Sequence, residues 1–482
     1  MGTDDKQLHV FFFPFMAPGR LLPMVDMARL FAARGVKATI ITTALNLSRF
    51  QAIIDRDIQS GLQIQVHTVE LPFSDAGIPE GCENVDTLPS RDLLNFSKAA
   101  ALLQPQFEKL VEHHLPDAII SDMNFTWTVD IAHKHHIPRL EFNGFSCFSL
   151  CVTDSINRYT PHIHAASESE PFLVSSLPDP LYLTQAQLVE RFVPGARDFL
   201  QKMQAEIDRY TSDVVINSFY ELEPDYIEHY QKTSGKKTWM LGPVSLCNKD
   251  SLSKAERGKK ASISQEWCLS WLDSRKPNSV LYVSFGSVCK FPKSQLKEIG
   301  LGLEASNQNF IWVIRDVDAG GLPEGFEERI QGRGLIIRGW APQVLILEHP
   351  AIGGFMTHCG WNSTLEAVSA GQPLITWPLF AEQFYNEKFV LQRLKIGISI
   401  GVETGFVWGE EERTGALVKR EKVEEVVTRL MGGGGEVEGM RKQAKKLGEM
   451  AKLAAGEGGS SNTNISLLIE HLKNQKRLRK IG

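Results

Sequence analysis

Short apolar runs alternate with amphipathic stretches along most of the chain. Residues 9–15 form an apolar run rich in Phe, and residues 37–42 form a second run rich in β-branched side chains. Between them, residues 22–34 repeat apolar side chains at helical spacing, and Gly35 follows as a candidate C-cap. Because continuous apolar runs are typical of buried parallel strands, this pattern predicts a strand–helix–strand unit with a right-handed crossover.

The same alternation returns in both halves of the chain. In the first half we expect further strands at residues 118–121, 139–142 and 214–217, with a helix at 127–135. In the second half we expect strands at residues 280–285, 310–314, 334–338, 353–357 and 373–377, with helices at 293–305 and 362–370. Residues 154–180 contain four prolines among polar side chains, which predicts an irregular insertion that shapes a binding cleft.

The composition changes near residue 250 and suggests where the chain divides. Residues 247–262 are charged and almost free of large apolar side chains, so we expect a linker there between domains 1–246 and 263–460. An amphipathic helix in the final part, 461–482, is expected to pack back toward the first domain. The predicted fold class is α/β, with two doubly wound, Rossmann-like domains that face a cleft at the carboxyl ends of their strands.

Charge and cysteine usage exclude several classes of protein. The net charge is only −5 and no basic stripe is present, so we expect no nucleic-acid partner. Seven scattered cysteines without zinc-ligand spacing favour reduced thiols over a disulfide framework. The chain has no pattern of a secretory signal and no apolar run near the ~20 residues that span a bilayer, so we expect a cytoplasmic monomer without membrane insertion.

A strand, a tight turn and a polar helix start follow one another around residue 360. Ser363 and Glu366 fit the Ser-x-x-Glu capping box, and the start of a helix offers free backbone N–H groups to a phosphate. His358 and Asn362 add polar donors at the same end, and Gly360 permits a close approach of the backbone. A capped helix with a core histidine explains the local pattern equally well.

The wider segment resembles a known family. Trp340-Ala-Pro-Gln343, His349-Pro350, the run from Thr357 to Glu366 and Pro378-Leu-Phe-Ala-Glu382-Gln383 look like the signature of plant secondary-product glycosyltransferases, the plant branch of family 1 UDP-glycosyltransferases. The run 11–19 and Asp26-Met-Ala28 resemble the branch that acts on flavonoids, triterpenoids and steroids. The resemblance covers essentially the full chain. It implies a GT-B fold and an inverting, UDP-glucose-dependent glucosyltransferase that acts on a small apolar plant metabolite.

The resemblance also implies roles for individual residues. Trp340 would stack on uracil, with Gln343 beside the ribose and Glu366 on its hydroxyls. The diphosphate would lie against His358, Asn362 and Ser363, helped by Ser284 and Ser287, and the hexose against Trp361, Glu382 and Gln383. Gln383 favours glucose as the donor sugar. For Trp340 and Trp361 the alternative is core packing. We expect no metal and no cofactor besides the co-substrate, because a helix dipole and hydrogen-bond donors can neutralise the diphosphate.

One departure from the family pattern concerns the catalytic base. Arg20 stands where the family has its histidine, and Asp122 matches the aspartate that orients it. Arginine stays protonated, so Arg20 cannot be the general base. Three interpretations remain: acceptors that need little help, with Asp122 taking the proton directly; an ion pair that leaves a nucleotide-sugar binder with feeble activity; or an engineered or decaying copy. Asp122 as a simple helix N-cap is a further alternative.

The remaining candidate residues give weaker indications of function. The histidine pairs 113–114 and 135–136 are expected to be solvated helix ends, because adjacent side chains point to different faces. Asn143 could face a substrate or simply form an Asn-Gly turn. The acceptor pocket is expected to come from the loops at 72–88 and 154–185, which contain Phe73, Phe172 and Leu173. A phosphorylase-like enzyme would need a lysine that binds pyridoxal phosphate, and no sequence feature suggests such a site.

Overall fold

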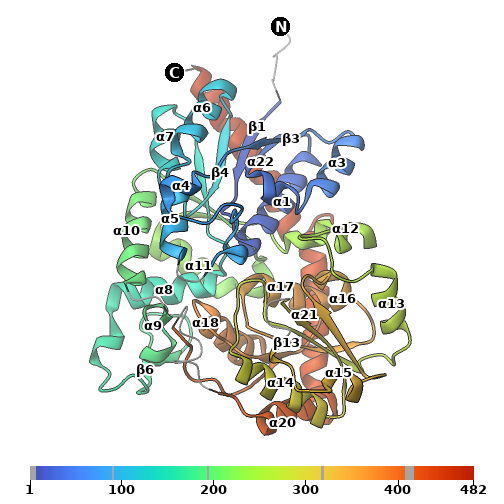
Figure 1. Ribbon diagram of the computed structural model, residues 1–482. Coiled ribbons are helices and arrows are strands. Elements are labelled where there is room, and N and C mark those ends of the chain that lie inside the picture. The colour runs from blue at the N-terminus through green and yellow to red at the C-terminus, as the bar shows by residue number, and fades with distance from the viewer. Residues whose placement is uncertain (1–6, 90–91, 193–194, 316–319, 408–416, 482) are drawn as a thin grey trace.

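The computed structural model describes residues 7–89, 92–192, 195–315, 320–407 and 417–481. Two α/β domains lie one above the other (Figure 1), each built around one parallel sheet. The first sheet has the strand order β3-β2-β1-β4-β5-β8-β9, and the second has the order β12-β11-β10-β13-β14-β15. In both sheets the order reverses beside the first strand of the domain, as in doubly wound folds, and the expected fold class is confirmed.

The strands of the first sheet are β1 (His9–Phe13), β2 (Lys37–Thr42), β3 (Ile64–Thr68), β4 (Ala118–Asp122), β5 (Arg139–Phe142), β8 (Asp213–Ile216) and β9 (Lys237–Met240). Its main helices are α1 (Pro18–Ala32), α3 (Gln51–Gln59), α5 (Leu93–Ala101), α6 (Gln104–His114), α7 (Thr128–Lys134), α8 (Cys147–Tyr159), α10 (Ala196–Asp208) and α11 (Pro224–Ser234). A small antiparallel pair, β6 (Phe172–Leu173) and β7 (Tyr182–Leu183), lies in the insertion between α8 and α10.

The second sheet contains β10 (Val280–Ser284), β11 (Asn309–Ile314), β12 (Gly334–Arg338), β13 (Ile352–Thr357), β14 (Leu374–Thr376) and β15 (Gly397–Ser399). The helices of this half are α12 (Ser251–Ala255), α13 (Gln265–Asp273), α14 (Lys293–Ala305), α16 (Gln343–Leu347), α17 (Trp361–Ala370), α18 (Gln383–Lys388), α20 (Arg420–Met431), α21 (Gly435–Ala455) and α22 (Ser460–Ile481).

The apolar run of β1 is explained by burial on both faces of the sheet. Phe12 points to the side of α1, where its ring meets Phe31 edge-on at 5.3 Å between centroids. Phe13 points to the opposite side and stacks on Phe125 at 4.0 Å. Since side chains alternate along a strand, a central strand covered by helices on both faces must be apolar at every position.

Several elements differ from the expectation. Helix α1 begins at Pro18, four residues early, because a proline at the first helical position already has the required φ and needs no N–H partner. Residue 20 therefore lies in a helical turn. Helix α8 runs to Tyr159, so the first residues of the expected irregular insertion are helical. Strands β3, β9 and β15 were not expected: β3 is half exposed and β15 has three residues, so neither has a long apolar run.

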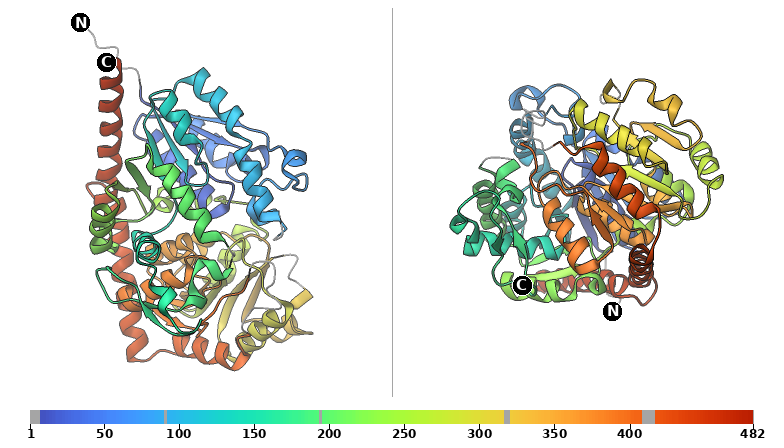
Figure 2. Two further views of the ribbon diagram at one scale, coloured as in Figure 1. Left: turned by 90° about the vertical axis from the view of Figure 1, so that its left-hand side faces the viewer. Right: turned by 90° about the horizontal axis from the view of Figure 1, so that it is seen from below.

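Helix α22 carries the end of the chain back over the first domain. It runs along one side of the molecule to the far end of that domain, where the C-terminus lies (Figure 2). Leu468 and Leu472 are fully buried in the core formed around β1 and α1. Near its end, Lys476 Nζ lies 2.8 Å from Asp117 Oδ2. No described helix is both long and apolar enough to cross a membrane.

Candidate functional site

The start of α17 meets the first domain at the carboxyl ends of both sheets. Asn362, just after β13, donates from Nδ2 to the carbonyl of Gly19 in the first turn of α1. The same amide accepts from Asn217 Nδ2, which follows β8, at 3.2 Å. Ligands of doubly wound folds bind beyond the carboxyl ends of the strands. The two domains therefore touch where such a ligand is expected.

Trp361 belongs to the contact between the domains. Its side chain is only 2 % exposed, and Nε1 donates to the carbonyl of Asn217 at 2.8 Å. The ring also packs near Phe389, with 6.3 Å between centroids. The indole therefore lies in the interdomain core, and the backbone N–H of Trp361 is the group that reaches the Glu382 carboxylate.

The helix α17 begins earlier than expected, and the predicted capping box is wrong. Its N-cap is Gly360, and the first intrahelical bond joins Thr364 N–H to the Gly360 carbonyl at 3.0 Å. Ser363 therefore lies inside the first turn, and the Glu366 carboxylate turns to other side chains. Gly360 has no side chain to cap this helix, and the Glu382 carboxylate takes the N–H of Trp361, so the N–H groups of Asn362 and Ser363 are the ones that can meet an anion.

His358 is enclosed by backbone at the end of β13. A Cβ at Gly286 would lie 2.6 Å from His358 Cε1, so the turn from Ser284 to Ser287 can pack on the ring only with glycine there. Gly286 also has a φ of +76°, which favours glycine. Burial lowers the pKa of His358 to about 4. The ring is neutral at pH 7 and can offer a hydrogen bond to a phosphate, but no charge.

A carboxylate and an amide meet beside the first turn of α17. Gln343, at the start of α16, donates from Nε2 to Glu366 Oε2 at 2.8 Å and to Ser363 Oγ at 3.1 Å. Tyr282 OH contacts Gln343 Oε1 at 3.4 Å. Three of the expected donor-binding residues are thus brought together, and the carboxylate oxygens of Glu366 suit a pair of hydroxyl donors.

Trp340 lies just before this group, at the end of β12. Its backbone N–H donates to Ser262 Oγ at 3.0 Å, and its carbonyl accepts from Ser262 N–H at 2.9 Å. The indole Nε1 is buried and has no hydrogen-bond partner among the described residues. The Trp340 side chain is only half-buried, so part of the indole is exposed to solvent.

Glu382 and Gln383 begin α18 next to the same helix start. Burial raises the pKa of Glu382, whereas the charge of Arg20 and hydrogen bonds from the backbone, Trp361 included, lower it. Gln383 is buried, and its Oε1 accepts the N–H groups of Leu379 at 2.9 Å and Phe380 at 3.1 Å. These bonds fix the orientation of the Gln383 amide.

Arg20, in the first turn of α1, forms an ion pair with Asp122, the last residue of β4. Arg20 Nη1 lies 3.8 Å from Asp122 Oδ2, and neither atom has a hydrogen-bond partner among the described residues. The guanidinium lies 4.3 Å above the Phe145 ring. Asp122 is completely buried, whereas the Arg20 side chain is 15 % exposed. The arginine therefore covers the aspartate.

Asp122 is not the N-cap of α7, which begins at Thr128. Its Oδ1 instead accepts the backbone and side-chain N–H groups of Asn124, at 3.0 and 2.6 Å. Burial raises the pKa of Asp122, whereas the Arg20 charge and the bonds from Asn124 lower it. Asn143 is buried and accepts from Phe145 N–H at 3.2 Å, so it forms the simple Asn-Gly turn.

One further residue of this group was not expected from the sequence. Arg257, in the expected linker, lies with Nη1 2.6 Å from Glu366 Oε1 and with Nε 2.8 Å from Asp26 Oδ2. Burial alone would lower the pKa of Arg257, but the charges of Asp26 and Glu366 raise it well above its ordinary value. No local pattern marks this arginine among the other charged residues of its segment.

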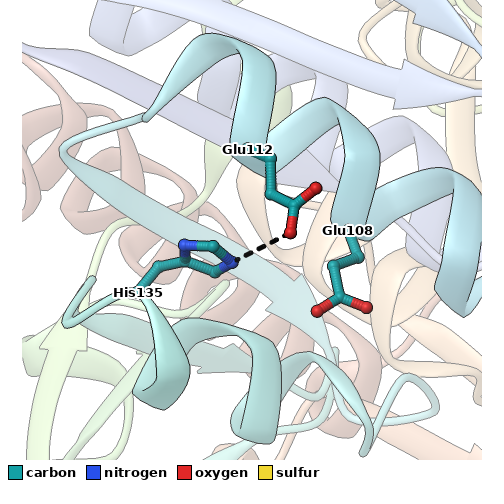
Figure 3. A group of neighbouring side chains, drawn as sticks. All are labelled: Glu108, Glu112 and His135. Atoms are coloured by element: carbon teal, nitrogen blue, oxygen red, sulfur yellow. Dashed lines mark ion pairs between the residues drawn. The ribbon is translucent and has the colours of Figure 1, made fainter.

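One group among the described residues has the composition of a metal site (Figure 3). Glu108 and Glu112 on α6 and His135 after α7 point toward one another. His135 Nε2 lies 3.9 Å from Glu112 Oε1. However, Lys134 Nζ lies 2.6 Å from Glu108 Oε1 and 3.5 Å from Glu112 Oε1. The ammonium group of Lys134 already supplies the cation for these two carboxylates.

Two domains built on parallel sheets, with the start of a helix, a carboxylate–amide pair and an indole at their junction, are typical of a GT-B glycosyltransferase that uses a nucleotide sugar. A family model, "UDP-glucoronosyl and UDP-glucosyl transferase", matches residues 110–402. The chain belongs to this family, as a plant family 1 UDP-glycosyltransferase.

Individual relatives are similar over their whole length. The chain is 50 % identical to scopoletin glucosyltransferase of Nicotiana tabacum, over 97 % of this chain and 98 % of the relative. It is 48 % identical to UDP-glucose flavonoid 3-O-glucosyltransferase 7 of Fragaria ananassa, over 97 % and 96 %. The solved structure of Glycyrrhiza uralensis UGT73P12 with glycyrrhetinic acid 3-O-monoglucuronide is 42 % identical, with a TM-score of 0.92 over 99 % and 97 % of the two chains.

Proposed function

We propose that this enzyme is an inverting glucosyltransferase that moves glucose from UDP-glucose to a phenolic oxygen of a small apolar acceptor. We further propose that it favours acceptors that lose their proton without help from the protein. The observation that carries the second part is Arg20, a permanent cation that covers the fully buried Asp122. Relatives named for scopoletin and for flavonoid 3-O-glucosylation support the acceptor class.

For the nucleotide-sugar donor, the proposal keeps the residue roles that the family resemblance implies. Uracil stacks on Trp340, and the ribose hydroxyls donate to Glu366, which Gln343 orients at 2.8 Å. The diphosphate lies at the start of α17 with neutral His358 and with Asn362, so a metal ion is not required in this proposal. Gln383 favours glucose over other hexoses.

Neither Arg20 nor Asp122 is suited to take the proton of the acceptor. Burial of Asp122 beneath Arg20 argues against direct transfer of the acceptor proton to that carboxylate. Phenols ionise near pH 10 or below when electron-poor, so a fraction arrives as the anion. The guanidinium of Arg20, partly exposed above Phe145, is suited to attract that oxyanion.

The bonds change in a single displacement. The acceptor oxyanion attacks the anomeric carbon of glucose and forms the glycosidic bond. The bond from that carbon to the diphosphate oxygen breaks, and UDP leaves with the electron pair. Attack from the face opposite the leaving group inverts the anomeric configuration, and the N–H groups at the start of α17 stabilise the charge on UDP.

A second candidate function is a nucleotide-sugar binder with little turnover. It is favoured by the contact of Arg20 with both Asp122 and Phe145, which holds the guanidinium in the place of the family's base. Loss of such a base costs about 10²–10⁴ in rate. This candidate shares the donor site with the first and differs only in turnover.

The experiment that separates them uses the full chain with UDP-glucose and acceptors of graded acidity: electron-poor phenols, ordinary phenols, carboxylic acids and aliphatic alcohols. Products are identified by mass spectrometry, and UDP affinity is measured by calorimetry. Phenol glucosides, formed fastest from the most acidic phenols, are the expected result. UDP binding without any glucoside would favour the binder, and a lack of UDP binding would contradict both candidates.

A further inference from the structure

The segment between the two domains lies against the nucleotide half of the site. Residues 251–262, which we call the strap, begin with α12 at the level where the domains meet (Figure 1). At the end of the strap, Ser262 exchanges two hydrogen bonds with the backbone of Trp340. Gly258 has a φ of +109°, and a Cβ there would come within 2.7 Å of Trp340 Cε2. The strap is thus fixed to the indole that is proposed to hold uracil.

The centre of the strap carries a buried cation between two carboxylates. Arg257 pairs with Asp26 on α1 of the first domain and with Glu366 on α17 of the second, at 2.8 and 2.6 Å. The three side chains are 8 %, 3 % and 7 % exposed. Removing one partner from such a buried group leaves an uncompensated charge. The orientation of Glu366 therefore depends on Arg257.

The Arg257 contact still leaves Glu366 able to bind a diol. An ionised carboxylate offers roughly four lone-pair sites. Arg257 uses one at Oε1 and Gln343 uses one at Oε2, so capacity for two hydroxyl donors remains. A bare carboxylate near a diphosphate would also repel it, and the neighbouring guanidinium offsets this repulsion.

We propose that Arg257 is a positioning residue of the donor site. It holds the Glu366 carboxylate in the orientation that receives the ribose hydroxyls, and it ties that carboxylate to Asp26 of the opposite domain. This inference rests on the proposed function, because it takes Glu366 as the group that binds ribose.

Other cations of the strap provide a matched control. Lys254 Nζ lies 2.6 Å from Glu348 Oε2, and Lys259 Nζ lies 2.9 Å from Asp86 Oδ2. Both fix the strap by an ion pair, but neither partner belongs to the proposed donor site. Lys254→Ala therefore removes a strap anchor of the same kind without touching Glu366.

The test compares UDP with deoxyuridine diphosphate, which lacks one ribose hydroxyl, by calorimetry on the full chain. The wild type is expected to prefer UDP. Arg257→Ala is expected to weaken UDP binding about tenfold and deoxyuridine diphosphate binding much less, so that the preference collapses. Lys254→Ala keeps the preference. Arg257→Lys restores it in part, because an ammonium group cannot bridge two carboxylates as a guanidinium does.

Each other outcome overturns the inference in a recognisable way. An unchanged preference in both Arg257 variants shows that the arginine does not orient the ribose-binding group. Tighter UDP binding by Arg257→Ala would show instead that Arg257 hinders UDP binding. If the wild type binds both nucleotides equally, Glu366 does not bind the ribose hydroxyl, yet the transferase proposal survives. If the wild type binds no UDP, both proposals fall.

Discussion

At the position of Arg20, one positive charge lies among buried carboxylates. Burial raises the pKa of Asp122 and of Glu382, and the charge of Arg20 lowers both. The guanidinium thus helps to keep two acidic groups ionised in a site that is proposed to hold a diphosphate as well. A neutral histidine at this position would remove that charge and add a group that can accept a proton.

Replacing Arg20 with His is expected to raise turnover of weakly acidic phenols and of alcohols by about 10²-fold or more, because a base is restored beside Asp122. The wild-type rate should rise with pH up to the acceptor's own pKa. The Arg20→His rate should instead rise around the imidazole pKa of ~6.5. Both are measured as kcat/KM against pH. Equal rates and equal profiles would show that residue 20 does not limit catalysis, and UDP affinity serves as the control.

Gly258 offers a second test at the residue scale. Gly258→Ala is expected to weaken UDP binding, because the added Cβ meets the Trp340 ring in the strap's present path. Gly61→Ala is the matched control: Gly61 also has a positive φ, +97°, but nothing lies within 4 Å of its Cβ position. Calorimetry should show a loss for Gly258→Ala alone. Equal losses would point to backbone strain and not to the indole contact.

At the scale of elements, the start of α8 is held by a carboxylate from another helix. Glu223, the N-cap residue of α11, accepts Phe148 N–H at 2.7 Å and Ser218 Oγ–H at 2.5 Å. A negative charge at the start of a helix is favourable. Burial nevertheless raises the pKa of Glu223 from 4.5 to about 7, against these hydrogen bonds.

This raised pKa predicts a pH-dependent stability. Between pH 4.5 and 7 the folded state binds the proton of Glu223 and the unfolded state does not, so the stabilising contribution is lost as pH rises through this window. The melting temperature of Glu223→Gln relative to wild type should therefore rise from pH 4.5 to 7, by the equivalent of about 3 kcal/mol. Glu221→Gln, at an exposed position two residues earlier, serves as the control substitution. A constant difference for Glu223→Gln would contradict the shift.

At the scale of the whole molecule, the end of the second half completes the core of the first. Helix α22 buries Leu468 and Leu472 beside α1 and β9, whereas Leu467 on the same helix is 54 % exposed. The proposed donor site also joins the two domains, since Asn362 and Trp361 of the second domain bond to Gly19 and Asn217 of the first. The stability of the first domain and the arrangement of the proposed site therefore both depend on contacts between the two halves of the chain.

Leu468→Ala is expected to destabilise the first domain by about 2–5 kcal/mol, because a fully buried side chain leaves a cavity. Leu467→Ala, one residue earlier on the same helix, should change stability by less than about 0.5 kcal/mol. Thermal unfolding of the full chain measures both. Similar melting temperatures for the two variants would show that α22 does not support the first domain.

Much of the architecture could be predicted from local pattern. The apolar run of β1, the helical spacing of α1 and the Gly turn before α17 each reflect a period or a backbone requirement within a few residues. Strand β3 was not predicted because it is half exposed and has no continuous apolar run. The predicted capping box was wrong because a serine three residues before a glutamate also occurs inside a helix.

The linear pattern was sufficient for the parallel α/β halves and, through the segment from Trp340 to Gln383, for the family, because both depend on neighbours along the chain. Only the tertiary structure decided three other features: the burial of Trp361, the covering of Asp122 by Arg20 and the bridge made by Arg257. Arg257 is 231 residues from Asp26 and 109 from Glu366, and no local property of an arginine indicates which distant carboxylates will share its charge.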